Sequence, residues 1–172
     1  MFNTSEKIIV NNKEYQIINF LGKGKGGYSY LCKYNDNYFV LKKIHHEKCD
    51  YYQFGNKIES ELKDYNTLKN LNIPMPELID VDVQKEIIIK QYINGPTIEQ
   101  LVKERKNINK FLLQMRNICL ILYKNNINID YYPTNFVIEN EQLFYIDYEC
   151  NVYDEKWDFE HWGIKYWIID QK

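Results

Sequence analysis

Three residues in the C-terminal half carry side-chain oxygens at a spacing suited to metal and proton chemistry. Asp130 is followed five residues later by Asn135, and Asp147 comes twelve residues after Asn135. Carboxylate and amide oxygens are the ligands that Mg²⁺ prefers, so Asn135 and Asp147 are candidate metal ligands. A carboxylate without a metal, such as Asp130, can orient a hydroxyl group and accept its proton. Each residue alone has an alternative interpretation as a turn residue.

A glycine cluster in the N-terminal half has the spacing of a phosphate-binding hairpin. Gly22, Gly24 and Gly27 form the pattern G-x-G-x-x-G, with Lys23 between the first two glycines. The cluster lies between two predicted strands, whereas dinucleotide-binding turns and Walker loops open a helix. A hairpin of this kind can lay backbone N–H groups over phosphates. A plain flexible hairpin is the alternative.

A lysine and a glutamate occupy positions where an unpaired charge is unfavourable. Strand alternation places Lys42 on one face with Val40 and Ile44, which suggests a lysine that reaches inward. Glu61 lies within or beside the apolar stripe of a helix predicted over residues 54–71, and a carboxylate there needs a partner. We therefore predict an ion pair between Lys42 and Glu61. A snorkelling lysine and a rim glutamate are the alternatives.

Hydrophobic periodicity predicts the elements that position these residues. Strands are expected over residues 7–10, 14–21, 28–34, 38–44, 78–83 and 86–93, and in a hairpin over 136–139 and 143–147. Helices are expected over residues 54–71, 97–104, 107–124 and 157–167. Thr97 is the expected N-cap of the second helix. The pattern predicts an α+β chain with a sheet-rich half and a helix-rich half.

Bulk composition excludes some classes of protein. The chain has 172 residues, is 45% hydrophobic and has a net charge of -2, so nucleic-acid binding is not indicated. The four cysteines, Cys32, Cys49, Cys119 and Cys150, are far apart and form no zinc pattern. No apolar run is long enough to span a bilayer, and residues 1–10 have no signal-like core. These features predict a reduced, cytoplasmic protein.

These motifs together resemble the protein-kinase-like superfamily. Residues 22–27 resemble its glycine-rich loop, residues 40–42 its lysine strand, and the span from Asp130 to Asn135 its catalytic loop. Residues 146–149, with the sequence I-D-Y-E, are similar to the metal-binding motif of aminoglycoside and choline kinases.

Other segments resemble the small atypical protein kinases, namely RIO kinases and the small kinase of the tRNA threonylcarbamoyl-modification complex. Residues 73–76, with the sequence I-P-M-P, resemble the exit from their glutamate helix. Residues 92–97 resemble their hinge and the segment after it. By this resemblance, backbone groups of Gln91 and Ile93 would hold adenine, and Val40 would line the nucleotide site.

The resemblance implies a bilobal fold and a kinase activity on protein Ser/Thr hydroxyls, autophosphorylation included. It implies an N-lobe over residues 1–93, with a five-stranded antiparallel sheet and one helix, and a truncated helical C-lobe over residues 94–172. ATP and Mg²⁺ would be the cofactors, and Lys42 would contact the phosphates of ATP. Asp130 would orient the acceptor hydroxyl and accept its proton. The short C-lobe leaves little room for a small-molecule pocket, so a protein acceptor or partner complex is expected.

Three departures from the family pattern keep two alternatives open. Asn128 stands where the family has His, Tyr132 stands where protein-serine kinases have Lys, and no A-P-E segment follows Asp147. A nucleotide-binding pseudokinase that works as a switch or scaffold is one alternative. A small-molecule kinase, indicated by the I-D-Y-E motif, is the other. The aromatic segment 157–167 either covers a core or docks a partner.

Overall fold

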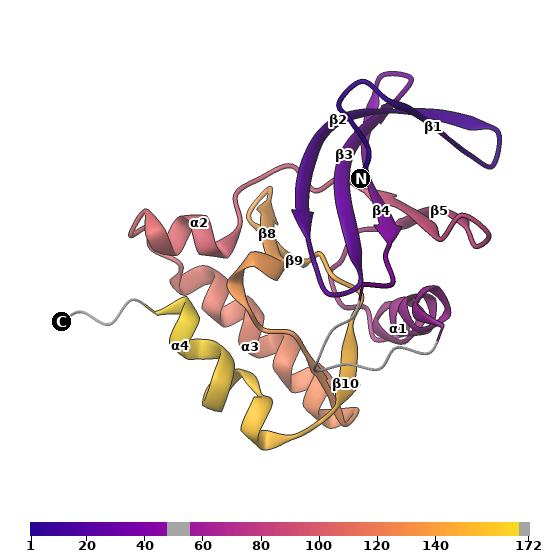
Figure 1. Ribbon diagram of the computed structural model, residues 1–172. Coiled ribbons are helices and arrows are strands. Elements are labelled where there is room, and N and C mark those ends of the chain that lie inside the picture. Colours follow the sequence, from indigo (N-terminus) through magenta and orange to yellow (C-terminus); the bar gives the residue numbers. More distant parts are fainter. Residues whose placement is uncertain (48–55, 169–172) are drawn as a thin grey trace. The chain divides into compact units, whose positions relative to one another are not determined.

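The structure is a computed structural model that describes residues 1–47 and 56–168 (Figure 1). The strands are β1 (Lys7–Val10), β2 (Lys13–Lys23), β3 (Gly27–Tyr34), β4 (Asn37–Ile44), β5 (Leu78–Asp82), β6 (Ile87–Gln91), β7 (Ile127–Ile129), β8 (Phe136–Glu139), β9 (Gln142–Tyr145) and β10 (Cys150–Val152). The α-helices are α1 (Lys57–Asn70), α2 (Ile98–Lys103), α3 (Asn109–Lys124) and α4 (Ile164–Trp167). The predicted α+β class is confirmed.

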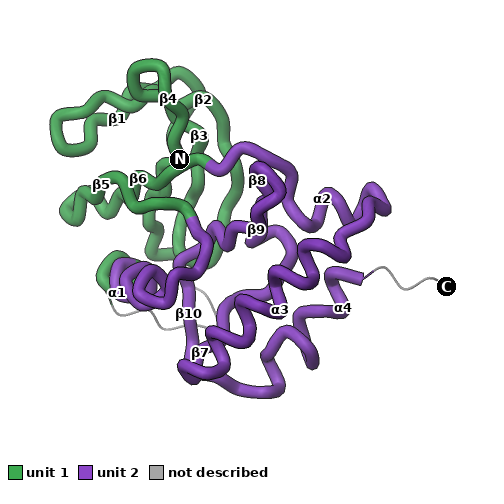
Figure 2. Tube along the Cα trace, turned by 180° about the vertical axis from the view of Figure 1, so that it is seen from behind, with its two compact units in different colours: residues 1–61, 76–92 green, residues 62–75, 93–172 purple. Residues whose placement is uncertain are grey.

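The chain divides into two compact units (Figure 2). Unit 1 comprises Met1–Glu61 and Pro76–Tyr92, and unit 2 comprises Leu62–Met75 and Ile93–Lys172. The expected division at residue 93 placed residues 62–75 with the N-terminal part, whereas here they belong to unit 2. The reason is packing, because Leu68 and Ile73 are buried in the same core as α3.

Unit 1 is built on a curled antiparallel sheet with the strand order β1-β2-β3-β4-β6-β5 (Figure 1). The five-stranded sheet that the resemblance implied was wrong, because the sheet has six strands. The strand predicted over residues 7–10 joins the sheet as β1, which folds back on β2 so that Val10 pairs with Lys13. Asn11 and Asn12 form the tight turn with φ values of 45° and 66°, a left-handed conformation that asparagine tolerates well.

Alternation along the strands separates the two faces of this sheet. Large side chains on one face form the core of unit 1, namely Val10, Tyr15, Ile17, Tyr30, Cys32, Leu41, Ile87 and Ile89. Because successive side chains point to opposite faces, Val40 and Lys42 lie on the other face from Leu41. The sheet therefore presents Lys42 on the opposite side from its main core.

Unit 2 contains the helices that the sequence predicted most clearly. Thr97 is the N-cap of α2, and its hydroxyl accepts the Gln100 N–H at 3.1 Å while the Gln100 side chain bonds back to the Thr97 N–H. The predicted apolar stripe of α3 packs into the unit 2 core, with Ile108, Met115, Cys119 and Leu122 buried. Helix α1 is described from Lys57, so the predicted start at Phe54 lies outside the described residues.

The rest of unit 2 departs from the prediction in two places. Residues 125–135, where the sequence predicted neither a helix nor a strand, contain β7, which pairs with β10 through Ile129 and Cys150. The segment expected to be a single helix over residues 157–167 consists of a 3₁₀ turn, a π-helical turn (Phe159–Gly163) and α4. Close packing explains the irregularity, because a Cβ at Gly163 would lie 2.6 Å from Cβ of Tyr131.

Within the described residues, no helix is both long enough and apolar enough to cross a membrane.

Candidate functional site

The candidate residues of unit 1 centre on Lys42. Backbone pairing places Lys42 in β4 between Ser29 of β3 and Ile88 of β6. The predicted ion pair is present, because Nζ of Lys42 lies 2.8 Å from each carboxylate oxygen of Glu61, in the second turn of α1. The side chains are only 12% and 10% exposed, so water screens this pair weakly. The pair fixes the Lys42 ammonium group on the face of the sheet that is opposite the main core of unit 1.

The glycine hairpin between β2 and β3 lies against the same lysine. Its tip is closed by the Gly24 N–H, which donates to the Gly27 carbonyl at 2.9 Å. A Cβ built on Gly26 would lie 3.8 Å from Nζ of Lys42, and one on Gly27 would lie 2.6 Å from the Lys43 carbonyl oxygen. Only glycine permits this approach at position 27. The hairpin and the ammonium of Lys42 are therefore neighbours within unit 1.

The segment after β4 holds the hairpin in place. Nε2 of His45 bonds to the Gly24 carbonyl at 3.0 Å, and the backbone N–H of His45 donates to the Gly26 carbonyl at 3.3 Å. Lys23, a predicted cofactor contact, pairs with Glu47 in this structure. Hydrogen bonds from Lys23 and Tyr28 lower the pKa of Glu47 to about 2.

The other three predicted nucleotide contacts are Val40, Gln91 and Ile93. Val40 lies beside Lys42 on the same face of β4, between Leu31 and Lys90. Gln91 ends β6, and its backbone N–H already donates to the Glu77 carbonyl at 2.9 Å. Ile93 belongs to unit 2, where its side chain is buried.

Unit 2 brings Asp130, Asn135 and Asp147 together through a chain of hydrogen bonds. The Asn135 side-chain amide donates to the Asp130 carbonyl at 3.3 Å. The Ile146 N–H donates to the Asn135 carbonyl at 2.9 Å, which places Asp147 next to this contact. Pro133 to Asn135 form one 3₁₀ turn. All three predicted residues therefore lie in one region, and each is half-buried.

Tyr145 holds this region together, although no sequence motif indicated it. Its hydroxyl donates to the Glu149 carbonyl at 2.9 Å and accepts the Asp130 N–H at 3.4 Å. Burial raises the pKa of Tyr145 well above its ordinary value, and the carboxylates of Asp147, Glu149 and Asp130 add to that rise. Strand alternation could have indicated it. Tyr145 lies on the same buried face of β9 as Leu143, and a buried tyrosine hydroxyl needs hydrogen-bond partners.

Asp64 is a second residue of this region that no sequence motif indicated. It lies on α1 within unit 2 and accepts the backbone N–H of Cys150 at 3.3 Å. Burial raises its pKa, and the nearby charge of Asp147 acts in the same direction, while the bond from Cys150 lowers it. No local pattern indicates this contact, because the two residues are 86 positions apart.

The unusual residues around Asp130 have structural partners. Asn128 is buried, where its amide donates to the Asp154 carbonyl at 2.8 Å and accepts the Tyr131 hydroxyl at 3.3 Å. Tyr131 is also buried, while Tyr132 is 38% exposed and its N–H donates to Oδ1 of Asp130 at 3.1 Å. Neither tyrosine fully covers Asp130, which remains half-buried.

Asn135 and Asp147 carry the amide and carboxylate oxygens that Mg²⁺ accepts as ligands. Among residues 1–47 and 56–168, no three His, Cys, Asp or Glu side chains are grouped to hold a metal alone. Mg²⁺ is usually bound by one or two carboxylates plus substrate phosphates, so a dedicated protein cage is not needed. Because Nδ2 of Asn135 is engaged with Asp130, Oδ1 is the end of the amide that a cation could bind.

No protein-family model matches this sequence, and no curated protein matches it.

Proposed function

We propose that this chain is an ATP- and Mg²⁺-dependent phosphotransferase with a two-lobed, protein-kinase-like fold that acts on protein hydroxyl groups. The observation that carries the proposal is the weakly exposed Lys42–Glu61 pair beneath a glycine hairpin. An ammonium held by a carboxylate is oriented without losing its charge, and backbone N–H groups of a glycine hairpin can approach phosphates. Unit 1 thus supplies a phosphate-binding arrangement.

In this proposal unit 2 supplies the metal ligands and the carboxylate that accepts the proton of the acceptor hydroxyl. Asn135 and Asp147 would hold Mg²⁺, which neutralises charge on the phosphates. Asp130 would accept the hydroxyl proton as the acceptor oxygen bonds to the γ-phosphorus and the bridging oxygen leaves with ADP. Tyr145 would fix the Asp130 loop through its bonds to Asp130 and Glu149.

A thermal-shift assay with ATP or GTP, each with and without Mg²⁺, tests nucleotide binding. At a nucleotide concentration about a hundredfold above Kd, Tm should rise by about 5–10 °C for a chain of this size. Lys42→Met and Asp147→Asn should remove most of the Mg²⁺-dependent rise. Lys43→Met is the matched control, because Lys43 is the next residue and bonds to the Lys85 carbonyl instead. An equal rise in all four proteins would refute the assignment.

Transfer is tested separately with γ-labelled ATP and a general acceptor protein. Asp130→Asn should keep the nucleotide-dependent rise in Tm but lose transfer, because the proton acceptor is removed and the metal ligands remain. Transfer by Asp147→Asn at the wild-type rate would contradict the proposal.

The environment of Asn128 favours a second candidate function, a nucleotide-binding pseudokinase. Its amide is used for structural bonds to Asp154 and Tyr131. A chain of this kind would show the Mg²⁺-dependent rise in Tm but would transfer no label to any acceptor or to itself.

A further inference from the structure

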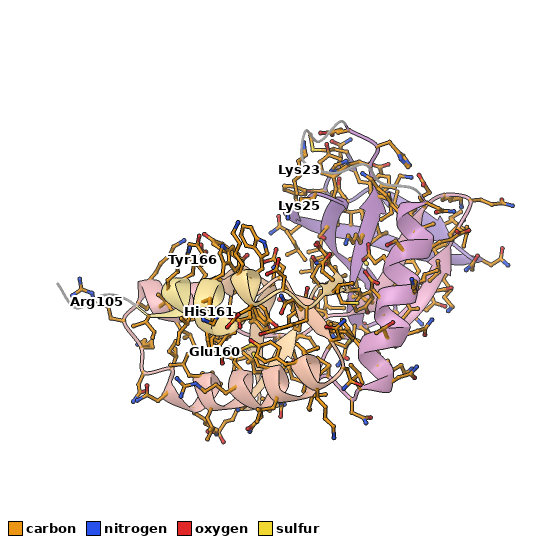
Figure 3. All side chains as sticks on the ribbon, turned by 90° about the horizontal axis from the view of Figure 1, so that it is seen from below. Lys23, Lys25, Arg105, Glu160, His161 and Tyr166 are labelled. Atoms are coloured by element: carbon orange, nitrogen blue, oxygen red, sulfur yellow. The ribbon has the colours of Figure 1, made fainter. Side chains whose placement is uncertain are left out.

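The glycine hairpin of residues 22–27 needs neighbouring groups to fix its position. Four of its six residues are glycines, and the other two are Lys23 and Lys25, both labelled in Figure 3. Glycine has the largest backbone freedom of any residue and no side chain that could pack. The tip is closed by the bond from the Gly24 N–H to the Gly27 carbonyl, but this bond does not anchor the hairpin to the rest of unit 1.

His45 anchors the hairpin through its backbone and its ring. The backbone N–H donates to the Gly26 carbonyl at 3.3 Å, and Nε2 bonds to the Gly24 carbonyl at 3.0 Å. A carbonyl only accepts, so Nε2 carries a proton. Nδ1 accepts the Glu47 N–H at 3.3 Å, so both contacts select the same neutral tautomer. The ring also packs on the Tyr28 ring, with centroids 5.0 Å apart.

Glu47 binds the hairpin on the face of the sheet opposite Lys42. Its carboxylate accepts hydrogen bonds from the Lys23 ammonium and the Tyr28 hydroxyl. Ser29 pairs with Lys42 across the strands, whereas Tyr28, one residue earlier, pairs with Lys23. Because successive side chains alternate, Lys23 and Tyr28 lie on the opposite face from Lys42. This register explains why Lys23 pairs with Glu47, and it leaves the face toward Lys42 for a ligand.

Helix α1 contacts the same anchor. Nζ of Lys57, in the first turn of α1, donates to the His45 carbonyl, and Lys57 is only 6% exposed. Four residues later, Glu61 forms the ion pair with Lys42. Residues four apart lie on one side of a helix. One side of α1 therefore holds the Lys42 ammonium through Glu61 and supports the glycine hairpin through Lys57 and His45.

These two contacts of α1 meet at the proposed phosphate site. A Cβ on Gly26 would lie 3.8 Å from Nζ of Lys42, so a small movement of the hairpin changes its distance from the ammonium. Groups that are already in place when a ligand arrives bind it more tightly, because less conformational entropy is lost on binding. The bond from Nε2 of His45 to Gly24 would therefore increase the affinity for a ligand held between the hairpin and Lys42.

We propose that His45 is a positioning residue that ties the glycine hairpin to α1 and thereby sets the affinity for the nucleotide. The tie is a property of unit 1 alone, while its effect on nucleotide affinity rests on the proposed function.

Hydrogen–deuterium exchange of the full chain without nucleotide tests the tie. We expect His45→Ala to accelerate exchange in residues 22–28 about three- to tenfold, as expected for the loss of one hydrogen bond. His45→Gln should stay within about twofold of wild type, because its amide nitrogen can donate to the same carbonyl. His46→Ala is the matched control, since His46 is the next residue and pairs with Glu86 instead.

Lys57→Met tests the link to α1 and should accelerate exchange of the hairpin in the same direction. Strand β6 is the internal reference, because global unfolding would accelerate exchange in residues 87–91 as well. If Lys57→Met does not fold, Lys57→Gln replaces it, since this side chain is too short to reach the His45 carbonyl in the same way. Acceleration by His45→Ala but not by the Lys57 variant would refute the tie to α1.

Calorimetric titration with Mg²⁺-ATP tests the effect on affinity. His45→Ala should raise Kd about three- to tenfold, whereas His45→Gln and His46→Ala should leave it within about twofold of wild type. Rescue by glutamine distinguishes the Nε2 bond from a general loss of structure.

The inference is overturned if His45→Ala leaves hairpin exchange unchanged, or if His45→Gln is as impaired as His45→Ala. Faster exchange with an unchanged Kd would confirm that His45 anchors the hairpin and refute its positioning role. If wild type binds no nucleotide, the proposed function and the effect on affinity are both refuted, and the exchange measurement alone decides the tie.

Discussion

Nζ of Lys42 lies 2.8 Å from both carboxylate oxygens of Glu61, in an ion pair whose two side chains are nearly buried. Removing one partner would leave the other charge with little solvation. We expect Lys42→Met and Glu61→Gln each to lower the free energy of unfolding by about 3 kcal/mol. The double variant Lys42→Met/Glu61→Gln should lose less free energy of unfolding than the sum of the two single losses. Urea unfolding measures all three, and strictly additive losses would contradict a coupled pair.

Tyr145→Phe removes the hydroxyl that joins the Asp130 loop to Glu149. We expect unfolding to become about 1–3 kcal/mol more favourable, because two backbone groups lose a partner. The Mg²⁺-ATP-dependent rise in Tm should also decrease, since the loop that holds Asn135 loosens.

Tyr30→Phe is the control for this variant. The Tyr30 hydroxyl accepts the Phe2 N–H at 3.1 Å in unit 1, so the same kind of bond is lost elsewhere. The control should lose stability but keep the nucleotide effect. A full nucleotide effect in Tyr145→Phe would show that the loop does not depend on this hydroxyl.

Gly95→Ala should destabilise the chain by about 1–3 kcal/mol, because a Cβ at this position would lie 1.7 Å from the Ile138 carbonyl oxygen. Gly22→Ala is the matched control, since nothing lies within 4 Å of its Cβ position. The measurement is Tm by circular dichroism. Equal effects of the two substitutions would be incompatible with the close approach at Gly95.

His161 should make stability depend on pH. The hydrogen bond to Asp158 raises the pKa of His161 above its ordinary value of 6.5, and the charges of Asp158, Glu155 and Glu160 act in the same direction. Because the folded pKa is raised, this stabilisation is complete below pH 6.5 and is lost as pH rises through the folded pKa.

The difference in Tm between wild type and His161→Gln measures this effect, and it should be larger at pH 5.5 than at pH 9. A difference that is constant over this range, or that grows with pH, would contradict the assignment.

The thiols of Cys32, Cys119 and Cys150 should react slowly with iodoacetamide at pH 8. Burial raises the pKa of each to about 12, and the Asp64 carboxylate adds to the rise for Cys150. Since the thiolate is the nucleophile, labelling should be more than a hundredfold slower than in the unfolded chain.

Peptide mass spectrometry gives the rate at each cysteine. Asp64→Asn should accelerate labelling of Cys150 while Cys32 stays slow as an internal control. Fast labelling of Cys32 in the native protein would contradict its buried position.

The sequence alone determined features that depend on neighbours within one or two turns. The N-cap at Thr97, the helix α3 and the turn at Asn140-Glu141 all follow from local rules. The Lys42–Glu61 pair was also predictable, because strand alternation and helical phase each placed a charge where only an opposite charge could compensate it.

Tertiary structure decided the contacts whose partners are distant in sequence. Asp64 meets Cys150 across 86 positions, and the Tyr145 hydroxyl meets the Asp130 N–H across 15. It also decided which terminal aromatic rings are buried, because the π-helical turn at Gly163 changes the phase that a regular helix would impose. Hydrophobic periodicity predicts which face of an element is buried, whereas tertiary packing determines which side chains on that face fit into the core.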